Sequence, residues 1–381
     1  MSDIRTPGFY ACPCQTCKIK NNGSGNLKIL ITGVCGFVGS RLALALRRLI
    51  DNVEIWGIDN LLRPGSEMNR TSAVAEGVRF FHGDLRLRSD LEGLPACEWV
   101  IDAAANPSVL AGVDGRSSAR QVAEHNLSGT LNLLEYCREH GSGLVLISTN
   151  RVYSVRDLAG LPVRDCGSSF ALDDAQSLPP GVSPRGLTEQ FPVRQPVSLY
   201  GATKLASEIM AIEYGATFGF PVWVDRCGVL AGAGQFGTAE QGIFSYWVHA
   251  HAARLRLRYI GFGARGLQVR DAFHPDDLAL LIAQQIRRDP PPEPIYNVGG
   301  GPANAMSLAQ LTAWCDHRFT PHEPQADDRA RPFDAPWIVM DSARARAEFG
   351  WEPTVTLPSI LDEIAAHAAM NPGWLARCGA V

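Results

Sequence analysis

Thr32-Gly33-Val34-Cys35-Gly36-Phe37-Val38-Gly39 is the stretch of sequence that decides the fold. It follows a short, apolar, β-branched segment at residues 27–32 and precedes a helical pattern at residues 40–49. Glycine lets the backbone turn sharply and lets a phosphate approach the free N–H groups at the start of a helix. This strand–turn–helix order predicts a βαβ unit over residues 27 to about 60 that binds a dinucleotide.

The spacing of the three glycines gives each a separate role in the turn. Gly33 permits the tight bend, Gly36 exposes the backbone to a phosphate, and Gly39 lets the helix pack on the strand. The pattern is GxxGxxG, one residue longer at its first interval than GxGxxG. Because a convincing strand and helix flank it, the turn indicates a ligand site that Phe37 and Val38 also line.

Asp59 ends the second predicted strand, at residues 53–58, and its position narrows the choice of dinucleotide. A carboxylate there accepts hydrogen bonds from the adenosine ribose hydroxyls and repels a 2′-phosphate. The sequence therefore favours NAD over NADP as the cofactor. Arg63 lies close by in the sequence and is the one feature that would weaken this preference.

Strands and helices then alternate along the chain. Further strands are expected at residues 78–82, 99–102, 144–148 and 221–226, with helices at 119–139 and 199–218. The alternation predicts an α/β fold, a Rossmann-type doubly wound parallel sheet with a smaller C-terminal α/β substrate domain. Ligands on such a sheet bind at the carboxyl ends of its strands. Candidate residues at those ends are Asp59, Asp84, Ala103, Ala104, Ala105, Ser148 and Thr149.

The expected domain boundaries follow changes in composition. Residues 1–26 end in a linker-like run and are expected to form a flexible tail. Residues 27–225 are expected to form the dinucleotide-binding domain, with a Pro-, Gly- and Ser-rich insertion or lid at 154–195. We expect residues 263–290 to return to that domain, residues 226–262 and 291–365 to form the substrate-binding domain, and residues 366–381 to form a C-terminal tail.

The overall composition excludes several classes of protein. The chain has 381 residues, 46% of them hydrophobic, and a net charge of −4, so it is globular and has no general attraction to nucleic acid or anionic membranes. No apolar run reaches the ~18 residues of a membrane span. The N-terminal residues contain no hydrophobic signal core, so the cytoplasm is the expected location.

Cys12, Cys14 and Cys17 are grouped within six residues and are the one candidate metal site. A tetrahedral zinc site needs a fourth ligand, and none follows at a usual spacing. We therefore expect no metal and interpret the group as part of the tail, with zinc binding as the alternative. Most other cysteines lie in apolar surroundings, as reduced thiols do.

Tyr200 and Lys204 form a candidate proton-transfer pair. Their spacing of four puts both on one face of the predicted helix, and Thr149 can supply a hydroxyl beside them. A lysine ammonium beside a phenol favours the phenolate, so we expect the pKa of Tyr200 to fall towards neutrality. The phenol would then exchange a proton with a substrate hydroxyl, while Lys204 also holds the nicotinamide ribose.

Together these motifs resemble those of the extended short-chain dehydrogenase/reductases, the family of NAD-dependent nucleotide-sugar epimerases and dehydratases, over about residues 27–365. The matching segments are TGVCGFVGS (32–40), DNL (59–61), HGDLR (82–86), NLSGTLNLLE (126–135), STNRVYS (148–154), YGATK (200–204) and YNVGGG (296–301). Within the family, the STN-x-VY segment together with DNLLRPGSEMNR (59–70), GQFGTAEQG (234–242) and LQVRDAFHPDD (267–277) most resembles the CDP-tyvelose (CDP-paratose) 2-epimerase group.

The resemblance implies NAD as the cofactor, a nucleotide-diphosphate sugar as the substrate, and a homodimer formed through the helices at 119–139 and 199–218. It implies that Thr149, Tyr200 and Lys204 are the catalytic residues. The residues implied to bind NAD are Gly33, Gly36, Phe37, Val38, Gly39, Asp59, Asn60, Asp84, Leu85, Ala103, Ala104, Ala105, Asn126, Ser148, Tyr200, Lys204, Cys227 and Val229. Those implied to bind the substrate are Thr149, Asn150, Gln235, Phe236, Gln241, Arg270 and Arg331, with the two arginines on the diphosphate.

The residues after Thr149 narrow the reaction. In the related dehydratases and decarboxylases carboxyl side chains follow the strand-end threonine, whereas this chain has Asn150 and Arg151. Neither serves as a carboxylic acid or base, so elimination is disfavoured and epimerisation through a transient ketone is favoured. The alternatives are 4-epimerisation, a related oxidoreductase or dehydratase, and a non-catalytic NAD-binding regulator, against which the intact catalytic trio argues.

Three departures from the family pattern leave the fold intact and bear on the substrate. Ser154 stands where a glycine is usual, and Asp102 stands where a histidine is usual. The segment that follows Arg331 lacks a second arginine found in many relatives.

Overall fold

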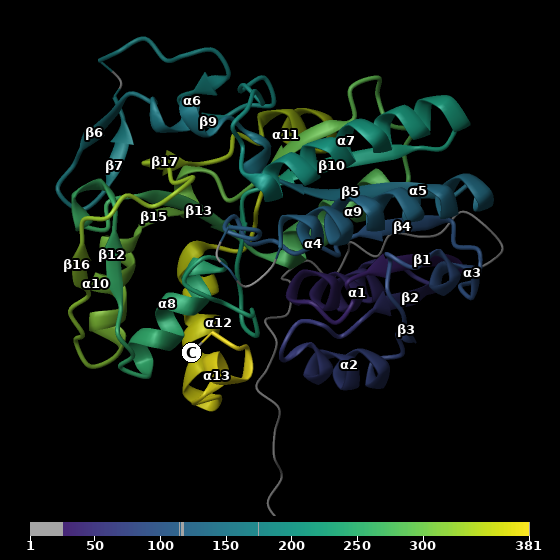
Figure 1. The fold of residues 1–381 in the computed structure, drawn as a ribbon, viewed down its shortest axis with the longest axis horizontal. Helices are drawn as coiled ribbons and strands as arrows, with labels where there is room; N and C mark the ends of the chain where they lie inside the picture. The colour runs from purple at the N-terminus through teal and green to yellow at the C-terminus, as the bar shows by residue number, and fades with distance from the viewer. Residues whose placement is uncertain (1–25, 114, 116–117, 174, 381) are drawn as a thin grey trace, which may run out of the picture.

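A seven-stranded parallel sheet forms the centre of the computed structural model, which describes residues 26–113, 115, 118–173 and 175–380 (Figure 1). The strand order is β14-β10-β5-β4-β1-β2-β3. The chain runs outward from β1 to β3 and then crosses to β4 on the other side of β1, which creates a ligand crevice at the carboxyl ends of these strands. The strands are β1 (Leu27–Thr32), β2 (Val53–Asp59), β3 (Arg79–His82), β4 (Trp99–Asp102), β5 (Gly143–Thr149), β10 (Val222–Cys227) and β14 (Ile295–Val298).

Helices cover both faces of this sheet, which is why its strands are apolar on both sides. In β1, Ile29 and Ile31 pack into one hydrophobic layer and Leu30 packs into the other. The first layer includes α1 (Phe37–Leu49), α2 (Ser66–Ala75), α9 (Pro275–Gln285) and α11 (Ala343–Phe349). The second includes α3 (Arg88–Glu92), α5 (Gly129–His140) and α7 (Leu199–Phe218), and α4 (Ala119–Ala123) joins α5 through a π-helical stretch, Glu124–Ser128. The predicted doubly wound α/β fold is confirmed.

The smaller lobe lies beside the carboxyl ends of the strands and is built from short elements (Figure 1). One sheet contains β11 (Val229–Leu230), β13 (Val269–Phe273), β15 (Ala305–Ser307) and β17 (Trp337–Ile338), and a second pairs β12 (Arg258–Ile260) with β16 (Gln325–Asp327). Its helices are α8 (Ile243–Ala252), α10 (Leu308–Arg318), α12 (Leu357–Met370) and α13 (Trp374–Arg377).

The insertion after β5 forms a small cap of its own. It contains α6 (Val155–Ala159) and two hairpins, β6 (Val163–Asp165) with β7 (Phe170–Leu172) and β8 (Val182–Ser183) with β9 (Gly186–Leu187). Leu158, Leu187 and Phe191 share a buried cluster with residues of β13 and β17. The cap therefore packs against the smaller lobe.

We expected residues 291–365 to belong to the substrate-binding domain, and this expectation is wrong for β14 and α11. β14 pairs in parallel with β10 and completes the main sheet, and Ala345 and Phe349 of α11 pack in the same layer as Ile29. Residues 291–365 are therefore shared between the two lobes. A four-residue apolar run indicates a strand, but its sequence does not say which sheet it joins.

The expected C-terminal tail at residues 366–381 is also wrong. The last turn of α12 reaches Met370, and Trp374 and Leu375 of α13 are buried in the core of the smaller lobe. The Trp374 ring stacks on Phe236 at 5.7 Å between ring centroids, and its indole N–H donates to the carbonyl of Gln235 at 2.9 Å. The end of the described chain thus supports the loop at residues 234–242.

The described residues give no membrane-spanning candidate, because no helix among them is long and apolar enough to cross a bilayer. Cys12, Cys14 and Cys17 lie outside the described residues, so the two interpretations of that group stay as stated. The cysteines that the structure describes are free, and of these all but Cys166 are buried.

We predict that Trp374→Ala lowers the free energy of unfolding by about 3–5 kcal/mol, because it removes a buried aromatic ring and leaves a cavity. Met370→Ala is the matched control, since Met370 is 56% exposed and its loss should change stability by less than about 0.5 kcal/mol. Urea unfolding of both variants measures the difference. Equal stabilities would mean that α13 does not belong to the folded core.

Candidate active site

A cavity of about 860 Å³ opens at the carboxyl ends of the parallel strands and extends under the smaller lobe. It brings together residues predicted to bind the cofactor and residues predicted to bind the substrate. The predicted residues that line it are Gly33, Gly36, Phe37, Val38, Gly39, Asp59, Asn60, Asp84, Leu85, Ala103, Ala104, Ala105, Ser148, Thr149, Asn150, Tyr200, Lys204, Cys227, Val229, Gln235, Phe236, Gln241, Arg270 and Arg331.

Asn126 is the one predicted cofactor residue that does not line the cavity. Its side chain accepts a hydrogen bond from the backbone N–H of Asn106 at 2.7 Å and donates to Thr203 Oγ1 at 3.1 Å. The side chain is buried, and these contacts occupy it. Asn126 therefore ties the loop after β4 to α7 and positions the cavity wall, which corrects its assignment as a direct cofactor contact.

The glycine turn forms a cradle that a side chain would fill. A Cβ at Gly33 would lie 2.9 Å from the Cα of Ala104, and one at Gly39 would lie 2.2 Å from the carbonyl oxygen of Gly33. Gly33 also has φ +61°, which favours glycine. No side chain caps the N-terminus of α1, so its first N–H groups face the cavity and suit a pyrophosphate.

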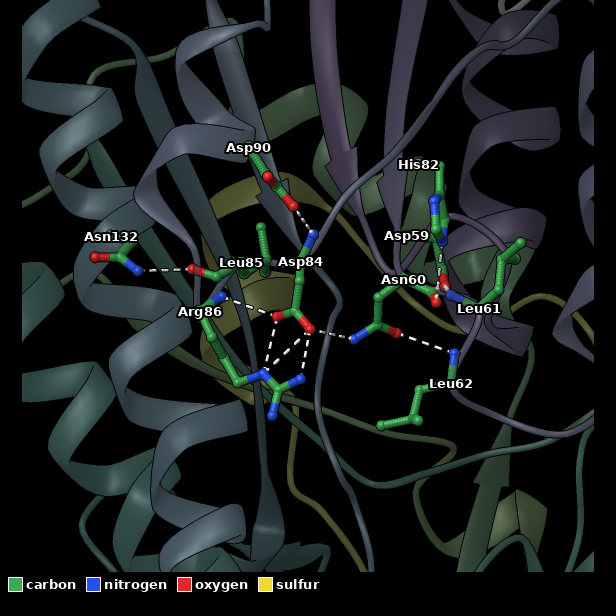
Figure 2. A network of polar contacts seen from close by, with 10 residues as sticks. All are labelled: Asp59, Asn60, Leu61, Leu62, His82, Asp84, Leu85, Arg86, Asp90 and Asn132. Carbon is green, nitrogen blue, oxygen red and sulfur yellow. Dashed lines mark hydrogen bonds and ion pairs between the residues drawn. The ribbon is translucent and has the colours of Figure 1, made fainter.

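Asp59 lies at the end of β2, beside Leu61 and His82 (Figure 2). Its carboxylate accepts hydrogen bonds from the backbone N–H groups of Cys35 at 2.9 Å and Leu61 at 2.8 Å. Burial raises its pKa, and these hydrogen bonds oppose the rise. Asp59 thus shapes the glycine turn and the loop after β2, besides presenting a carboxylate where a ribose would lie.

Asp84 anchors a second polar group beside Asp59 (Figure 2). Arg86 makes an ion pair with its carboxylate at 2.6 Å, and Asn60 donates to it at 3.1 Å. The ion pair with Arg86 holds the pKa of Asp84 below its usual range. The backbone N–H of Asp84 donates to Asp90 at 2.8 Å, which fixes the loop after β3. The predicted adenine contacts, Asp84 and Leu85, therefore lie on a rigid rim.

Thr149, Tyr200 and Lys204 all line the cavity. Thr149 ends β5, while Tyr200 and Lys204 lie one turn apart at the start of α7. The helix begins where it does because Ser198 Oγ accepts a hydrogen bond from the N–H of Gly201 at 3.1 Å. All three side chains are buried, and Tyr200 is hydrogen-bonded to Thr149.

The expected fall in the pKa of Tyr200 is not what the structure shows. Burial raises the pKa of Tyr200 to about 12, and the hydrogen bond from Thr149 and the positive charge of Arg151 oppose that rise. Burial lowers the pKa of Lys204, and electrostatic interactions with Asp102, Glu208 and Cys227 oppose this. The prediction failed because it counted the lysine charge and left out the cost of burying a phenolate.

The substrate end of the cavity carries a group of arginines. Arg270 forms an ion pair with Asp334 at 2.8 Å, and Arg331 donates to the carbonyl of Ala239 at 3.0 Å. Burial lowers the pKa of Arg270, and Asp334 opposes that shift. The segments around residues 234–242, 267–277 and 331–337, far apart in the sequence, therefore converge here.

Several lining residues were missed as site residues by sequence reasoning. Arg151 is the most important, because it lies beside Thr149 and Tyr200, and Arg63 and Arg86 also line the cavity. Arg63 donates to the carbonyl of Phe236 at 2.5 Å and to Gln241 at 3.2 Å, and so joins the two halves of the cavity. Arg151 follows the carboxyl end of β5, and this position in the sequence could have identified it as a site residue. Others missed are His125, Arg256, Arg258, Gln268 and Asp334.

The parallel sheet, the glycine turn and the cavity at the carboxyl ends of the strands define a class of protein: a Rossmann-type enzyme that binds a dinucleotide. The family model for the NAD dependent epimerase/dehydratase family matches residues 29–299. The chain belongs to that family, and NAD is its cofactor.

Individual relatives agree with the family assignment. The CDP-paratose 2-epimerase of Salmonella typhi is 30% identical over 355 residues, which cover 87% of this chain and 96% of the relative. The UDP-glucose 4-epimerase of Corynebacterium glutamicum is 28% identical over 349 residues, 87% of this chain and 92% of the relative. Among solved structures, the UDP-glucose 4-epimerase of Thermus thermophilus in complex with NAD superposes with a TM-score of 0.69 at 25% identity, covering 90% of this chain and 99% of that one.

We predict that Gly201→Ala lowers turnover of the enzyme's substrate by about 100-fold, because a small displacement of catalytic groups is costly. A Cβ at Gly201 would lie 2.2 Å from the carbonyl oxygen of Arg151, so α7 would have to move away from the end of β5. Gly160→Ala is the control, since its Cβ would meet Arg156 at an ordinary 3.4 Å. Steady-state kinetics test both variants, and wild-type turnover in Gly201→Ala would contradict the account.

Proposed function

We propose that this chain is a nucleotide-sugar epimerase that oxidises its substrate to a transient ketone and reduces it again from the other face, as a CDP-tyvelose/CDP-paratose 2-epimerase would. The observation that carries the proposal is the pair of residues after Thr149. Asn150 and Arg151 line the cavity there, and neither is a carboxylic acid or base of the kind that elimination needs. The family and the trio supply oxidation and reduction, so epimerisation is the outcome best supported.

Each residue of the trio has a distinct part in the proposed reaction. Tyr200 takes the proton from the sugar hydroxyl and later returns it, while Thr149 holds the same oxygen. Lys204 lies one turn along α7 and holds the nicotinamide ribose. NAD, when bound, accepts a hydride from the sugar carbon and gives it back.

The diphosphate of the substrate is assigned to the arginine end of the cavity. Arg270 and Arg331 present guanidinium groups that suit bidentate contacts with phosphate oxygens. Gln235, Phe236 and Gln241 also line the cavity and would contact the sugar. The Arg270 side chain is only 12% exposed, so water screens its attraction for an anion less than at the open surface.

The cytidine nucleotide and the C2 position rest on the 30% identity with the Salmonella typhi 2-epimerase. The second candidate is a nucleotide-sugar 4-epimerase, which the 28% identity with the Corynebacterium glutamicum UDP-glucose 4-epimerase favours. A related nucleotide-sugar oxidoreductase or dehydratase is the remaining alternative. These candidates differ in the carbon that changes and in whether NADH is left over.

A panel of CDP-, UDP-, GDP- and dTDP-sugars, followed by proton NMR of the products, tests the proposal. We expect purified protein to carry bound NAD, and one sugar to be inverted at a single carbon without added cofactor. Inversion at C4 would select the second candidate. Stoichiometric NADH that persists after substrate is added would contradict the epimerase proposal, because an epimerase regenerates its cofactor in every turnover.

We predict that Tyr200→Phe lowers turnover by at least about 100-fold while NAD stays bound, because the proton acceptor is lost and the cofactor cradle is intact. Tyr214→Phe is the matched control on the same helix, since the Tyr214 hydroxyl contacts Glu135 outside the cavity. Kinetics and the absorbance of released NAD measure the two effects. Unchanged turnover in Tyr200→Phe would remove Tyr200 from the mechanism.

We also propose a cytoplasmic homodimer that pairs α5 and α7 with the same helices of a second copy. Ile209 and Phe218 on α7 are 55% and 49% exposed, which supports an apolar contact there. The free cysteines among the described residues support a reducing compartment. Light scattering that gives the mass of one chain at micromolar concentration would contradict the dimer.

A further inference from the structure

Arg151 is held rigidly at the edge of the catalytic trio. It lies in the 3₁₀ turn Asn150–Val152 that follows β5, and its backbone N–H donates to Thr149 Oγ1 at 3.2 Å. Its carbonyl oxygen sits against Gly201 at the start of α7, where even a Cβ would be only 2.2 Å away. The side chain reaches across the cavity, and Nη1 donates to the carbonyl of Phe333 at 3.3 Å.

The guanidinium of Arg151 lacks a matching negative charge. Among the described residues, no carboxylate lies within ion-pair distance of it. The carboxylate that acts on Arg151 electrostatically is that of Asp334, and Arg270 already pairs with Asp334 at 2.8 Å. A partly buried cation is costly unless an anion or several acceptors face it. The hydrogen bond to Phe333 occupies one of five guanidinium N–H groups, so donors remain for a ligand.

Arg151 lies between the two ends of the proposed substrate. Its electrostatic neighbours include Tyr200 of the trio and also Arg270, Asp334 and Arg331 of the substrate end. A substrate that places a sugar hydroxyl on Tyr200 and its diphosphate on Arg270 and Arg331 must pass the guanidinium of Arg151. The part of the substrate that faces Arg151 is therefore the sugar near the reacting carbon.

We propose that Arg151 is a further catalytic residue, which contacts the reacting oxygen of the sugar and stabilises the negative charge shared by that oxygen and Tyr200 Oη. The sugar contact rests on the proposed function, whereas the interaction with Tyr200 does not. In the oxidation, Tyr200 acts in its phenolate form: the sugar O–H bond breaks and its proton passes to the phenolate oxygen Oη. The C–H bond breaks and its hydrogen leaves with both electrons to NAD, so that a C=O bond forms and NAD is reduced.

The chemistry of a guanidinium explains why this residue suits epimerisation. It cannot accept a proton at physiological pH, so it contributes charge and hydrogen bonds without assisting the loss of water. Its charge opposes the effect of burial on the pKa of Tyr200, as does the hydrogen bond from Thr149, whereas Cys227 acts the other way. Burial together with Arg270 and Arg331 lowers the pKa of Arg151 itself to about 10, which leaves it charged at neutral pH.

Arg151→Gln and Arg151→Lys in the NAD-bound enzyme test the proposal, with Arg331→Gln as the control. The Tyr200 phenolate is titrated by ultraviolet difference absorbance after subtraction of Tyr200→Phe, and CDP and UDP affinities are measured by calorimetry. We expect Arg151→Gln to move the Tyr200 titration to higher pH, because a stabilising cation is lost. We expect kcat to fall by about 100-fold, as when an oxyanion donor is removed, nucleoside diphosphate affinity to stay within about twofold, and Arg151→Lys to restore part of the titration and of kcat.

The control separates the sugar end from the diphosphate end. Arg331→Gln should weaken CDP and UDP binding by at least about tenfold, the effect of losing a charged hydrogen bond, and leave the Tyr200 titration in place. The proposal is overturned if the titration does not move in Arg151→Gln, or if that variant loses nucleoside diphosphate affinity as Arg331→Gln does while kcat is unchanged. If the wild-type enzyme inverts no nucleotide sugar, the proposed function fails, but the titration still decides whether Arg151 acts on Tyr200.

Discussion

The approach of α1 to the carbonyl of Gly33 is the constraint on which the rest of the site depends. Gly39 permits it, since a Cβ there would lie 2.2 Å from that carbonyl oxygen. The packing aims the uncapped start of α1 at the cavity and places Arg41 in the next turn. Arg41 donates to the carbonyl of Ala233 at 3.0 Å, and Glu363 of α12 accepts from the N–H of Ala233 at 3.3 Å. The cofactor turn and the loop at residues 234–242 are thus held by one network.

A second close contact, between the carbonyl of Arg151 and Gly201, positions the trio. It joins the end of β5 to the start of α7, so Thr149 and Tyr200 come from different elements but meet in one buried site. Burial excludes water and strengthens each electrostatic interaction, so the pKa of Tyr200 depends on its neighbours. Burial disfavours the phenolate, and the charge of Arg151 and the hydrogen bond from Thr149 oppose that effect.

The sequence was most informative where local pattern and ligand chemistry coincide. Strand ends carry the site in a parallel sheet, so the strand pattern alone assigns residues such as Asp59 and Thr149 to the cavity that they line. Three features could not be predicted in this way. The role of Asn126 depends on which backbone it meets, the membership of β14 depends on long-range pairing, and the pKa of Tyr200 depends on burial. Each depends on tertiary contacts, which short sequence patterns do not predict.

In the proposed reaction one hydride leaves the sugar, stays on NAD and returns to the same carbon. The most direct measurement uses a nucleotide-sugar substrate deuterated at the carbon that inverts, with NMR or mass analysis of the product formed in ordinary water. We expect the deuterium to be retained at that carbon in the inverted product, because the bound cofactor would carry it through the cycle. Loss of the deuterium to water would rule out this reaction, since it would mean that inversion proceeds by removal of a proton and needs no hydride transfer.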